Sequence, residues 1–313
     1  MDQLNDVENV EREFVDMLDR KVKLQSLGDG AQGAVKKIKL ENGIFYAVKA
    51  YEGKNPKQDY ERESYITKQF MKQCNDYLVC FSGSVVHDNK YWLITQFLDG
   101  YEELLKLLTN ETSLLYLGRE GRVMPNVNIY INMIKGLEVL HGLNISHHDI
   151  KPENILVNIK TSNIKYIDFG MACCMERNFK CGQGGSPAYA APEISEVDTL
   201  DKSKLTDLWS LGCVIYACEY GQETLDDPEG YYSIPPRQFN RKGKLTAFLR
   251  DPNVQGRLKF ERNGFAFDLT KLLNMNPAER TLDCYKKTNS TFAILKASLS
   301  RWILKQNSTG IRR

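Results

Sequence analysis

Long apolar runs are missing from this 313-residue chain. The longest uncharged one, at residues 211–218, is far too short to cross a bilayer. The first ten residues are acidic and contain no apolar stretch, so we expect no secretory signal peptide. The sequence therefore predicts a soluble, intracellular protein without membrane contact, and it does not distinguish cytoplasm from nucleus.

A large excess of charge is also missing, since the net charge is only +2. The charges are unevenly placed: residues 1–20 carry seven acidic side chains, and residues 285–313 carry seven Lys or Arg and no acid. Such runs are usually solvated chain ends, so we do not expect a nucleic-acid partner. A basic tail that contacts nucleic acid or an acidic partner stays open as the alternative. The oligomeric state is not indicated.

Metal and disulfide patterns are absent. The chain has eight cysteines but no C-x-x-C pair, and its four histidines are not spaced as zinc ligands. Without a secretory signal, we expect reduced thiols. Whether Cys173, Cys174 or Cys181 is redox-active cannot be read from the sequence.

What is present is ordinary globular composition, with 42% hydrophobic and 26% charged residues, in a chain long enough for two lobes. Helical spacing of apolar residues in 1–20 is followed by a strand-rich region. Asn42-Gly43 is a strong hairpin signal between strands at 34–40 and 44–49. We expect a helix over 59–73 and further strands at 78–86 and 91–97.

Beyond Asp99-Gly100 the pattern becomes helical, with segments expected at 102–108, 128–143, 205–220, 265–273 and 292–304. The stretch 221–264 resists assignment and is interpreted as an irregular insertion. The sequence thus predicts an α+β fold of two lobes. Its parts are an acidic, helical N-terminal extension (1–20), a small β-rich lobe (21–98), a larger helical lobe (99–304) and a basic tail (305–313).

A glycine-rich motif, G-x-G-x-x-G, is formed by Gly28, Gly30 and Gly33. It lies between two strands, which argues against a dinucleotide-binding turn, and no Gly-Lys-Ser/Thr follows, which excludes a Walker A loop. A glycine-rich hairpin can instead cover a triphosphate, because its backbone N–H groups approach closely.

Lys49 ends the next apolar strand and is a candidate for the α- and β-phosphates. It needs a carboxylate to hold it. Glu63 is the best candidate, since Ile66 and Phe70 follow it with the spacing of a packed helix face, and Glu61 is the runner-up.

The most specific motifs come later in the chain. His147-His148-Asp149 begins a segment that continues with Lys151 and Asn154, and Asp168-Phe169-Gly170 follows it. Ala191-Pro192-Glu193 and then Asp207 complete the series. In this order the motifs resemble the eukaryotic protein kinase family, serine/threonine type, from about Lys21 to Trp302.

The resemblance implies a bilobal kinase fold that transfers the γ-phosphate of ATP, with Mg²⁺, to Ser or Thr hydroxyls of protein substrates. Phosphoryl transfer needs positioning and charge neutralisation. Asp149 is placed to accept the proton of the substrate hydroxyl and Lys151 to neutralise the γ-phosphate. Asn154 and Asp168 offer the oxygen ligands that Mg²⁺ prefers.

The resemblance also implies a nucleotide site and its supports. Thr95 is expected as the gatekeeper, Leu98 as a hinge residue that meets the adenine edge, and Glu102 at the ribose. Asp207 would brace the catalytic loop, Glu193 would pair with Arg280, and His147, Phe169 and Phe81 would stack. The expected nucleotide contacts are Leu27, Gly28, Gly30, Gly33, Val35, Ala47, Lys49, Thr95, Gln96, Leu98, Glu102 and Leu156.

Two positions depart from the family pattern. His148 stands where arginine is usual, and Thr67 stands where an apolar residue usually follows the helix glutamate. Residues 171–184 contain no Ser, Thr or Tyr, so phosphate clamp and phosphate acceptor are missing together. We therefore predict activity without activation-segment phosphorylation.

Two other functions compete with an active kinase. A pseudokinase scaffold of the same fold would normally lack Lys49, Asp149 or Asp168, all of which are present. A small-molecule kinase usually lacks the Ala-Pro-Glu motif with its distant arginine.

Overall fold

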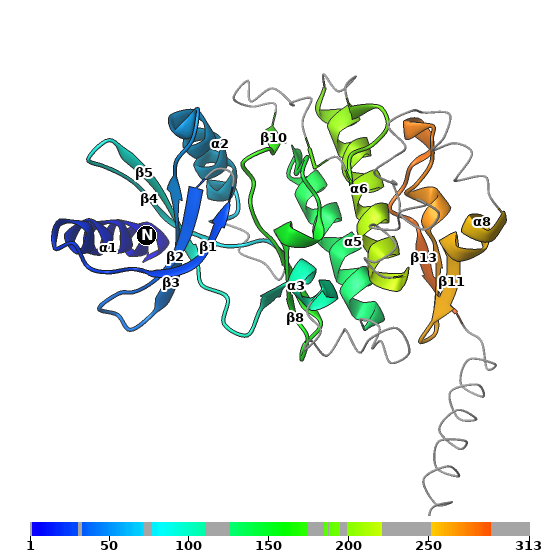
Figure 1. Ribbon diagram of the computed structural model, residues 1–313, viewed down its shortest axis with the longest axis horizontal. Helices are drawn as coiled ribbons and strands as arrows, with labels where there is room; N and C mark the ends of the chain where they lie inside the picture. The colour runs from blue at the N-terminus through cyan, green and yellow to red at the C-terminus, as the bar shows by residue number, and fades with distance from the viewer. Residues whose placement is uncertain are drawn as a thin grey trace, which may run out of the picture.

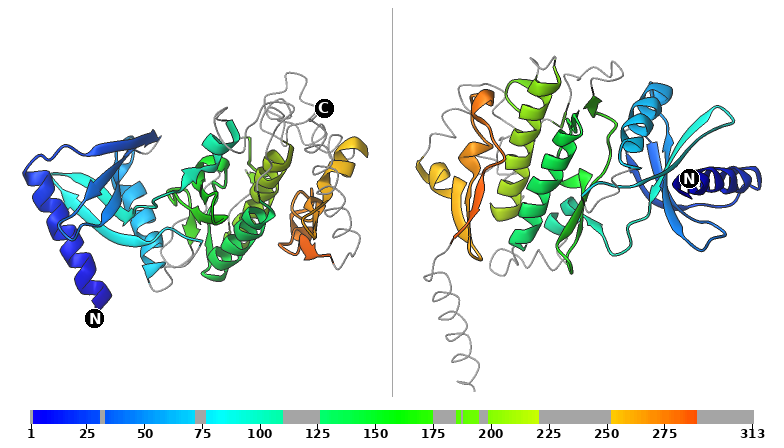
Figure 2. Two further views of the ribbon diagram at one scale, coloured as in Figure 1. Left: turned by 90° about the horizontal axis from the view of Figure 1, so that it is seen from below. Right: turned by 180° about the vertical axis from the view of Figure 1, so that it is seen from behind.

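The computed structural model describes residues 2–30, 33–71, 77–109, 126–174, 185–186, 188–194, 199–220 and 252–288. They form two lobes arranged along the long axis of the molecule, as Figures 1 and 2 show. A β-sheet dominates the first lobe, and long helices dominate the second. The predicted two-lobed α+β fold is confirmed. Within these ranges no helix combines the length and apolarity that a membrane span needs.

The small lobe is built on a five-stranded antiparallel sheet in the order β1-β2-β3-β5-β4. The predicted turn at Asn42-Gly43 joins β2 to β3, with Gly43 at a φ of +79°. Gly33 has a φ of +146°, and a Cβ there would lie 1.7 Å from the carbonyl oxygen of Ala50. Only glycine fits at this position. The strands are β1 (Gln25–Gly30), β2 (Gly33–Lys39), β3 (Phe45–Tyr51), β4 (Phe81–His87) and β5 (Lys90–Gln96).

Helices cover both faces of this sheet: α1 (Asp2–Asp19) lies on one and α2 (Pro56–Lys68) on the other. Successive side chains of β3 alternate between the faces. Val48 therefore packs in one cluster with Phe14 of α1, whereas Lys49 reaches α2. The predicted N-terminal helix is confirmed. Helix α2 begins three residues before the expected start, because Pro56 suits the first turn of a helix.

The large lobe is centred on α5 (Val127–Gly142) and α6 (Leu200–Tyr220), which carry large buried side chains such as Tyr130, Trp209 and Tyr216. Three small sheets surround them, in the orders β6-β8-β9, β10-β7 and β11-β12-β13. Their strands are β6 (Glu102–Glu103), β7 (Ile145–Ser146), β8 (Ile155–Asn158), β9 (Asn163–Tyr166), β10 (Cys173–Cys174), β11 (Lys259–Arg262), β12 (Phe265–Asp268) and β13 (Tyr285–Lys287). Shorter helices are α3 (Leu104–Thr109), α8 (Pro252–Leu258) and the 3₁₀ turns Pro152–Asn154, Leu269–Lys271 and Pro277–Glu279.

The helix predicted at 265–273 is wrong. Residues Phe265–Asp268 form β12, which pairs with both β11 and β13, and a 3₁₀ turn follows. Asn263 and Gly264 join β11 to β12 with φ of +48° and +79°, so the Asn-Gly hairpin signal was present here too.

Other assignments need smaller corrections. The helix expected at 102–108 starts with the short strand β6 and becomes helical only at α3. The part of 221–264 that the structure describes is not irregular, because it contains α8 and β11. The helix predicted at 292–304 lies outside the described residues.

The cysteines in the described ranges divide into two groups. Cys174, Cys213, Cys218 and Cys284 are buried and form no disulfide, as predicted, and burial raises the pKa of the Cys284 thiol to about 12. The prediction of reduced thiols is wrong for Cys80 and Cys173, each of which is disulfide-bonded. Which sulfurs meet depends on the approach of loops in three dimensions, which sequence spacing does not reveal.

Phe14 tests how firmly α1 belongs to the lobe. Its ring is fully buried and meets Trp92 edge-on, with 5.4 Å between the ring centroids. Phe14→Ala should lower the free energy of unfolding by about 3–5 kcal/mol through the cavity it leaves. Glu8→Ala, at an exposed position of the same helix, is the control in a urea titration. Equal midpoints for both variants would contradict the packing described.

Candidate active site

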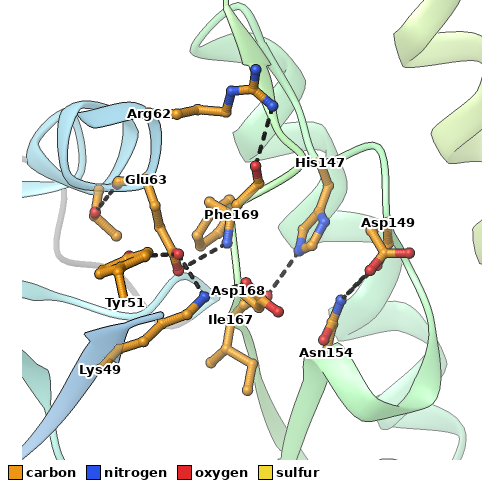
Figure 3. A network of polar contacts seen from close by, with 12 residues as sticks. Lys49, Tyr51, Arg62, Glu63, His147, Asp149, Asn154, Ile167, Asp168 and Phe169 are labelled. Atoms are coloured by element: carbon orange, nitrogen blue, oxygen red, sulfur yellow. Dashed lines mark hydrogen bonds and ion pairs between the residues drawn. The ribbon is translucent and has the colours of Figure 1, made fainter. Parts of the chain in front are cut away.

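A three-membered ion cluster lies where α2 meets the sheet and the segment after β9 (Figure 3). The Lys49 Nζ is 2.7 Å from Glu63 Oε2 and 2.7 Å from Asp168 Oδ1. The Glu63 side chain is 4% exposed and the Lys49 side chain 14%, so removing either partner would leave a poorly solvated charge without compensation. The runner-up Glu61 instead contacts Lys57 at 3.8 Å and is 54% exposed.

Burial and charge compete in this cluster. Burial alone would lower the pKa of Lys49, but the carboxylates of Glu63 and Asp168 outweigh it and raise that pKa. Burial raises the pKa of Glu63, and the neighbouring ammonium opposes the rise. Burial would also raise the pKa of Asp168, but the charge and hydrogen bond of Lys49 outweigh burial and lower that pKa. The cluster thus holds a permanent cation against an ionised Asp168.

A second polar cluster surrounds Asp149 in the loop between β7 and β8. The Asn154 side chain donates to its carbonyl oxygen at 2.8 Å and to its carboxylate at 3.1 Å. Lys151 Nζ lies 2.9 Å from Asp149 Oδ2, and the backbone N–H and hydroxyl of Ser186 donate to Oδ1 at 3.0 and 2.9 Å. Burial would raise the pKa of Asp149, but Lys151 and Ser186 outweigh it and lower that pKa. A carboxylate is thus kept ionised next to a hydroxyl.

The two clusters are tied together through the backbone. The Ile167 N–H donates to the Asn154 carbonyl at 3.1 Å, and the ring Nε2 of His147 lies 3.0 Å from the Ile167 carbonyl (Figure 3). Asp168 follows directly with a φ of +59°, a conformation that non-glycine residues adopt rarely. The loop and Asp168 therefore share one rigid frame.

The donor set suits a magnesium ion. Asp168 and Asn154 offer a carboxylate and an amide oxygen, and the Asn154 amide is oriented because its nitrogen donates to Asp149. In the described part of the chain no group of three or more His, Cys, Asp or Glu could hold a metal by itself. Magnesium is commonly held by one or two side chains together with substrate phosphates, so the residues present fit it.

Asp207 of α6 holds the start of the loop between β7 and β8. Its carboxylate accepts the backbone N–H groups of His147 and His148 at 2.9 and 2.7 Å, the Ser146 hydroxyl at 2.7 Å, and lies 2.9 Å from Nε2 of His141. Burial would raise the pKa of Asp207, but the bond and charge of His141 outweigh it, and the pKa is lowered. Four contacts to one buried carboxylate fix where the loop begins.

The stack between the lobes differs from the expected one. Phe169 lies between Phe70 and His147, with 4.9 Å between ring centroids on each side. The predicted third member, Phe81, packs instead with Tyr51 and Leu93. Phe70 was signalled by its position seven residues after Glu63. The departure at Thr67 is explained locally, because its buried hydroxyl bonds to the Glu63 carbonyl within α2.

The remaining expected nucleotide contacts occupy several elements. Thr95 lies opposite Ala47 in the β3–β5 pairing, and Val35 lies opposite Lys49. Leu156 of β8 is half-buried on the large-lobe side, and Glu102 is exposed at β6. Gly28 and Gly30 lie in β1 together with the exposed Leu27, and Gly33 is the first residue of β2. Gln96 donates its N–H to the Cys80 carbonyl at 3.0 Å, and Leu98 packs against the large-lobe core.

Glu193 and Arg280 meet as expected from the sequence. The guanidinium is fully buried, donates to Glu193 Oε2 at 2.9 Å and lies over the Trp209 ring at 5.0 Å. This pair connects the Ala-Pro-Glu motif to α6.

A family model described as "Protein kinase domain" matches residues 22–285. The chain belongs to the protein kinase family. Among curated proteins it is 28% identical over 237 residues to the MAP kinase kinase MKK1/SSP32 of Saccharomyces cerevisiae, which covers 70% of this chain and 44% of that protein. It is 29% identical over 210 residues to the serine/threonine-protein kinase pakH of Dictyostelium discoideum (65% of this chain, 38% of that protein).

Serine/threonine-protein kinase 10 of Rattus norvegicus is 31% identical over 204 residues, which cover 61% of this chain and 20% of that protein. The matched parts thus span from a fifth to less than half of these relatives. Helix α1 lies outside the residues that the kinase model matches.

Asp207→Asn should loosen the loop between β7 and β8, because an amide nitrogen would face N–H and O–H donors. We expect the free energy of unfolding to fall by about 1–3 kcal/mol, measured by urea titration against Asp201→Asn, an exposed position of the same helix. The lowered pKa of Asp207 means that its stabilisation is present above the usual carboxyl pKa of about 3.9 and is lost as pH falls through the folded value. A loss that persisted unchanged in strong acid would contradict this assignment.

Proposed function

We propose that this chain is an active serine/threonine protein kinase that transfers the γ-phosphate of ATP to Ser or Thr hydroxyls of proteins. The observation that carries the proposal is the contact of one lysine, Lys49, with both Glu63 and Asp168 at 2.7 Å. Family membership supports the use of ATP and of protein substrates.

In the proposed reaction the substrate hydroxyl lies between Asp149 and Lys151. Its oxygen attacks the γ-phosphorus, its proton passes to the Asp149 carboxylate, and the bond from the γ-phosphorus to the β–γ bridging oxygen breaks to release ADP. The Ser186 hydroxyl supports this placement, since it donates to Asp149 and accepts from Lys151 at 2.9 Å each. A small aliphatic hydroxyl therefore suits the space between the two groups.

Lys49 is proposed to hold the α- and β-phosphates and Glu63 to hold Lys49. When bound through Asp168 and Asn154, Mg²⁺ supplies positive charge against the phosphate oxygens. The nucleotide is proposed to lie between the lobes against Val35, Ala47 and Leu156. The alternative is a pseudokinase scaffold that binds partners without phosphoryl transfer.

The first test separates chemistry from nucleotide binding. Asp149→Asn should reduce phosphorylation of an array-selected Ser/Thr peptide by about 10²–10³-fold and leave the Kd for Mg·ATP nearly unchanged, because Asp149 touches the acceptor. Asp168→Asn should also weaken Mg·ATP binding. Asp88→Asn, 86% exposed at the β4–β5 turn, is the control. Wild-type protein that binds Mg·ATP but phosphorylates no peptide would favour the pseudokinase.

We further propose that this enzyme needs no phosphate on its activation segment. The supporting observation concerns His148, which is 4% exposed and lies with Nδ1 2.7 Å from the hydroxyl of Ser203. Its backbone N–H is also taken by Asp207. The side chain at the usual clamp position is therefore engaged inside the lobe and does not extend toward a phosphate.

Phosphatase treatment of bacterially expressed protein tests this second proposal. We expect turnover with Mg·ATP and peptide to be the same before and after treatment, within about twofold, since no clamp loses its ligand. Mass spectrometry confirms that phosphate was removed. A large loss of activity that returns with a phosphate mapped between Asp168 and Glu193 would refute it.

A further inference from the structure

A tyrosine on β3 touches the ion cluster (Figure 3). Tyr51 follows Lys49 by two positions and therefore points to the same face of the strand. Its hydroxyl donates to Glu63 Oε2 at 2.6 Å, and the side chain is almost fully buried. The Lys49 Nζ lies 5.1 Å from the centre of the Tyr51 ring.

We propose that Tyr51 is a positioning residue of this kinase, whose hydroxyl fixes the Glu63 carboxylate in the orientation that holds Lys49 against the nucleotide. The inference rests on the proposed roles of Lys49 and Glu63. It adds a third side chain to a pair that motif reading treats as complete.

The geometry explains why a third donor matters. Glu63 Oε2 receives both Lys49 Nζ and the Tyr51 hydroxyl, while Oε1 accepts the Phe169 N–H at 3.2 Å. A glutamate has three side-chain torsions, and fixing them is entropically unfavourable. Donors from β3 and from the segment after β9 together allow one orientation. Without the hydroxyl, Oε2 keeps only the flexible ammonium, and the carboxylate gains freedom to rotate away from the lysine.

The tyrosine ring is itself held in place. It meets Tyr60 of α2 edge-on at 5.8 Å, and Tyr60 lies 5.3 Å from Tyr91 of β5. Phe81 and Leu93 complete the apolar cluster. The tyrosine ring is thus packed against residues of β4, β5 and α2, the helix that carries Glu63. This packing fixes the position of the hydroxyl. Burial and then the charge of Glu63 raise the pKa of Tyr51, so the phenol stays a donor throughout the working range.

The hydroxyl also affects the charge state of Glu63. Burial raises the pKa of this carboxyl, Lys49 opposes the rise, Asp168 adds to it, and the hydrogen bonds from Lys49 and Tyr51 lower it. These are the charged and titratable groups that face Glu63 from β3 and from the segment after β9. Loss of the Tyr51 bond should therefore raise the Glu63 pKa, and activity on the acid side of the pH profile should fall at a higher pH.

The experiment removes one oxygen. For Tyr51→Phe we expect kcat/KM for ATP to fall about tenfold, as for a lost hydrogen bond to a charged group, with the KM for the peptide unchanged. The acid limb of the pH profile should move upward. Tyr46→Phe is the matched control, because Tyr46 is a buried tyrosine of the same strand whose hydroxyl accepts from Asn42 at 3.2 Å, away from the site.

A double-mutant cycle separates positioning from general packing. In a Glu63→Gln background, Tyr51→Phe should change kcat/KM less than twofold, because the carboxylate through which it acts is gone. A full tenfold loss in that background, or wild-type kinetics for Tyr51→Phe alone, would overturn the role of Tyr51. Wild-type turnover in Glu63→Gln alone would overturn the proposed function of Glu63 and this inference with it. Denaturation midpoints show that activity is compared between folded proteins.

Discussion

The largely buried ammonium of Lys49 constrains how the elements of the small lobe are arranged. A charge without a partner in this position would be strongly unfavourable, so carboxylates must reach it from other segments. Glu63 arrives on α2 and Asp168 from the large lobe, each at 2.7 Å. These two contacts join β3 to α2 and to the second lobe. Lys49 can therefore be shielded from solvent only when the two lobes are arranged so that both carboxylates reach it.

The second constraint concerns the start of the loop between β7 and β8, which the carboxylate of Asp207 holds in place. Asp207 accepts two backbone N–H groups and the Ser146 hydroxyl, and it lies 2.9 Å from Nε2 of His141. Two links then carry the position of that loop to the first cluster. One runs through the Ile167 backbone, and the other runs through the stack of Phe70, Phe169 and His147. A fixed loop and a fixed ion cluster are therefore parts of one connected frame.

Much of this arrangement could be predicted from the sequence, because turns and motifs are determined by residues that are close together in the chain. Asn42-Gly43 specified its hairpin, and the spacing after Glu63 indicated a packed face of α2. What sequence reasoning missed depends on partners distant in the chain. The apolar run at 265–268 is a strand because β11 and β13 flank it, although its periodicity also suits a helix. Phe70 displaced Phe81 from the stack only because α2 brings it against Phe169. The Tyr51 contact likewise needs α2 folded onto β3, since nothing in a tyrosine two positions after a lysine predicts a bond to a glutamate.

Helix α1 shows that the frame extends beyond the part matched by the kinase model. Glu11 Oε1 accepts the N–H of Ser84 at 2.7 Å, and Glu13 Oε2 accepts that of Glu41 at 2.9 Å. A Cβ on Gly83 would lie 2.9 Å from Glu11 Cγ, so any larger residue there would force the Glu11 side chain to shift. Because α1 covers the face of β3 opposite to Lys49, the strand is held from both sides. The N-terminal helix thus supports the same strand that carries Lys49 and Tyr51.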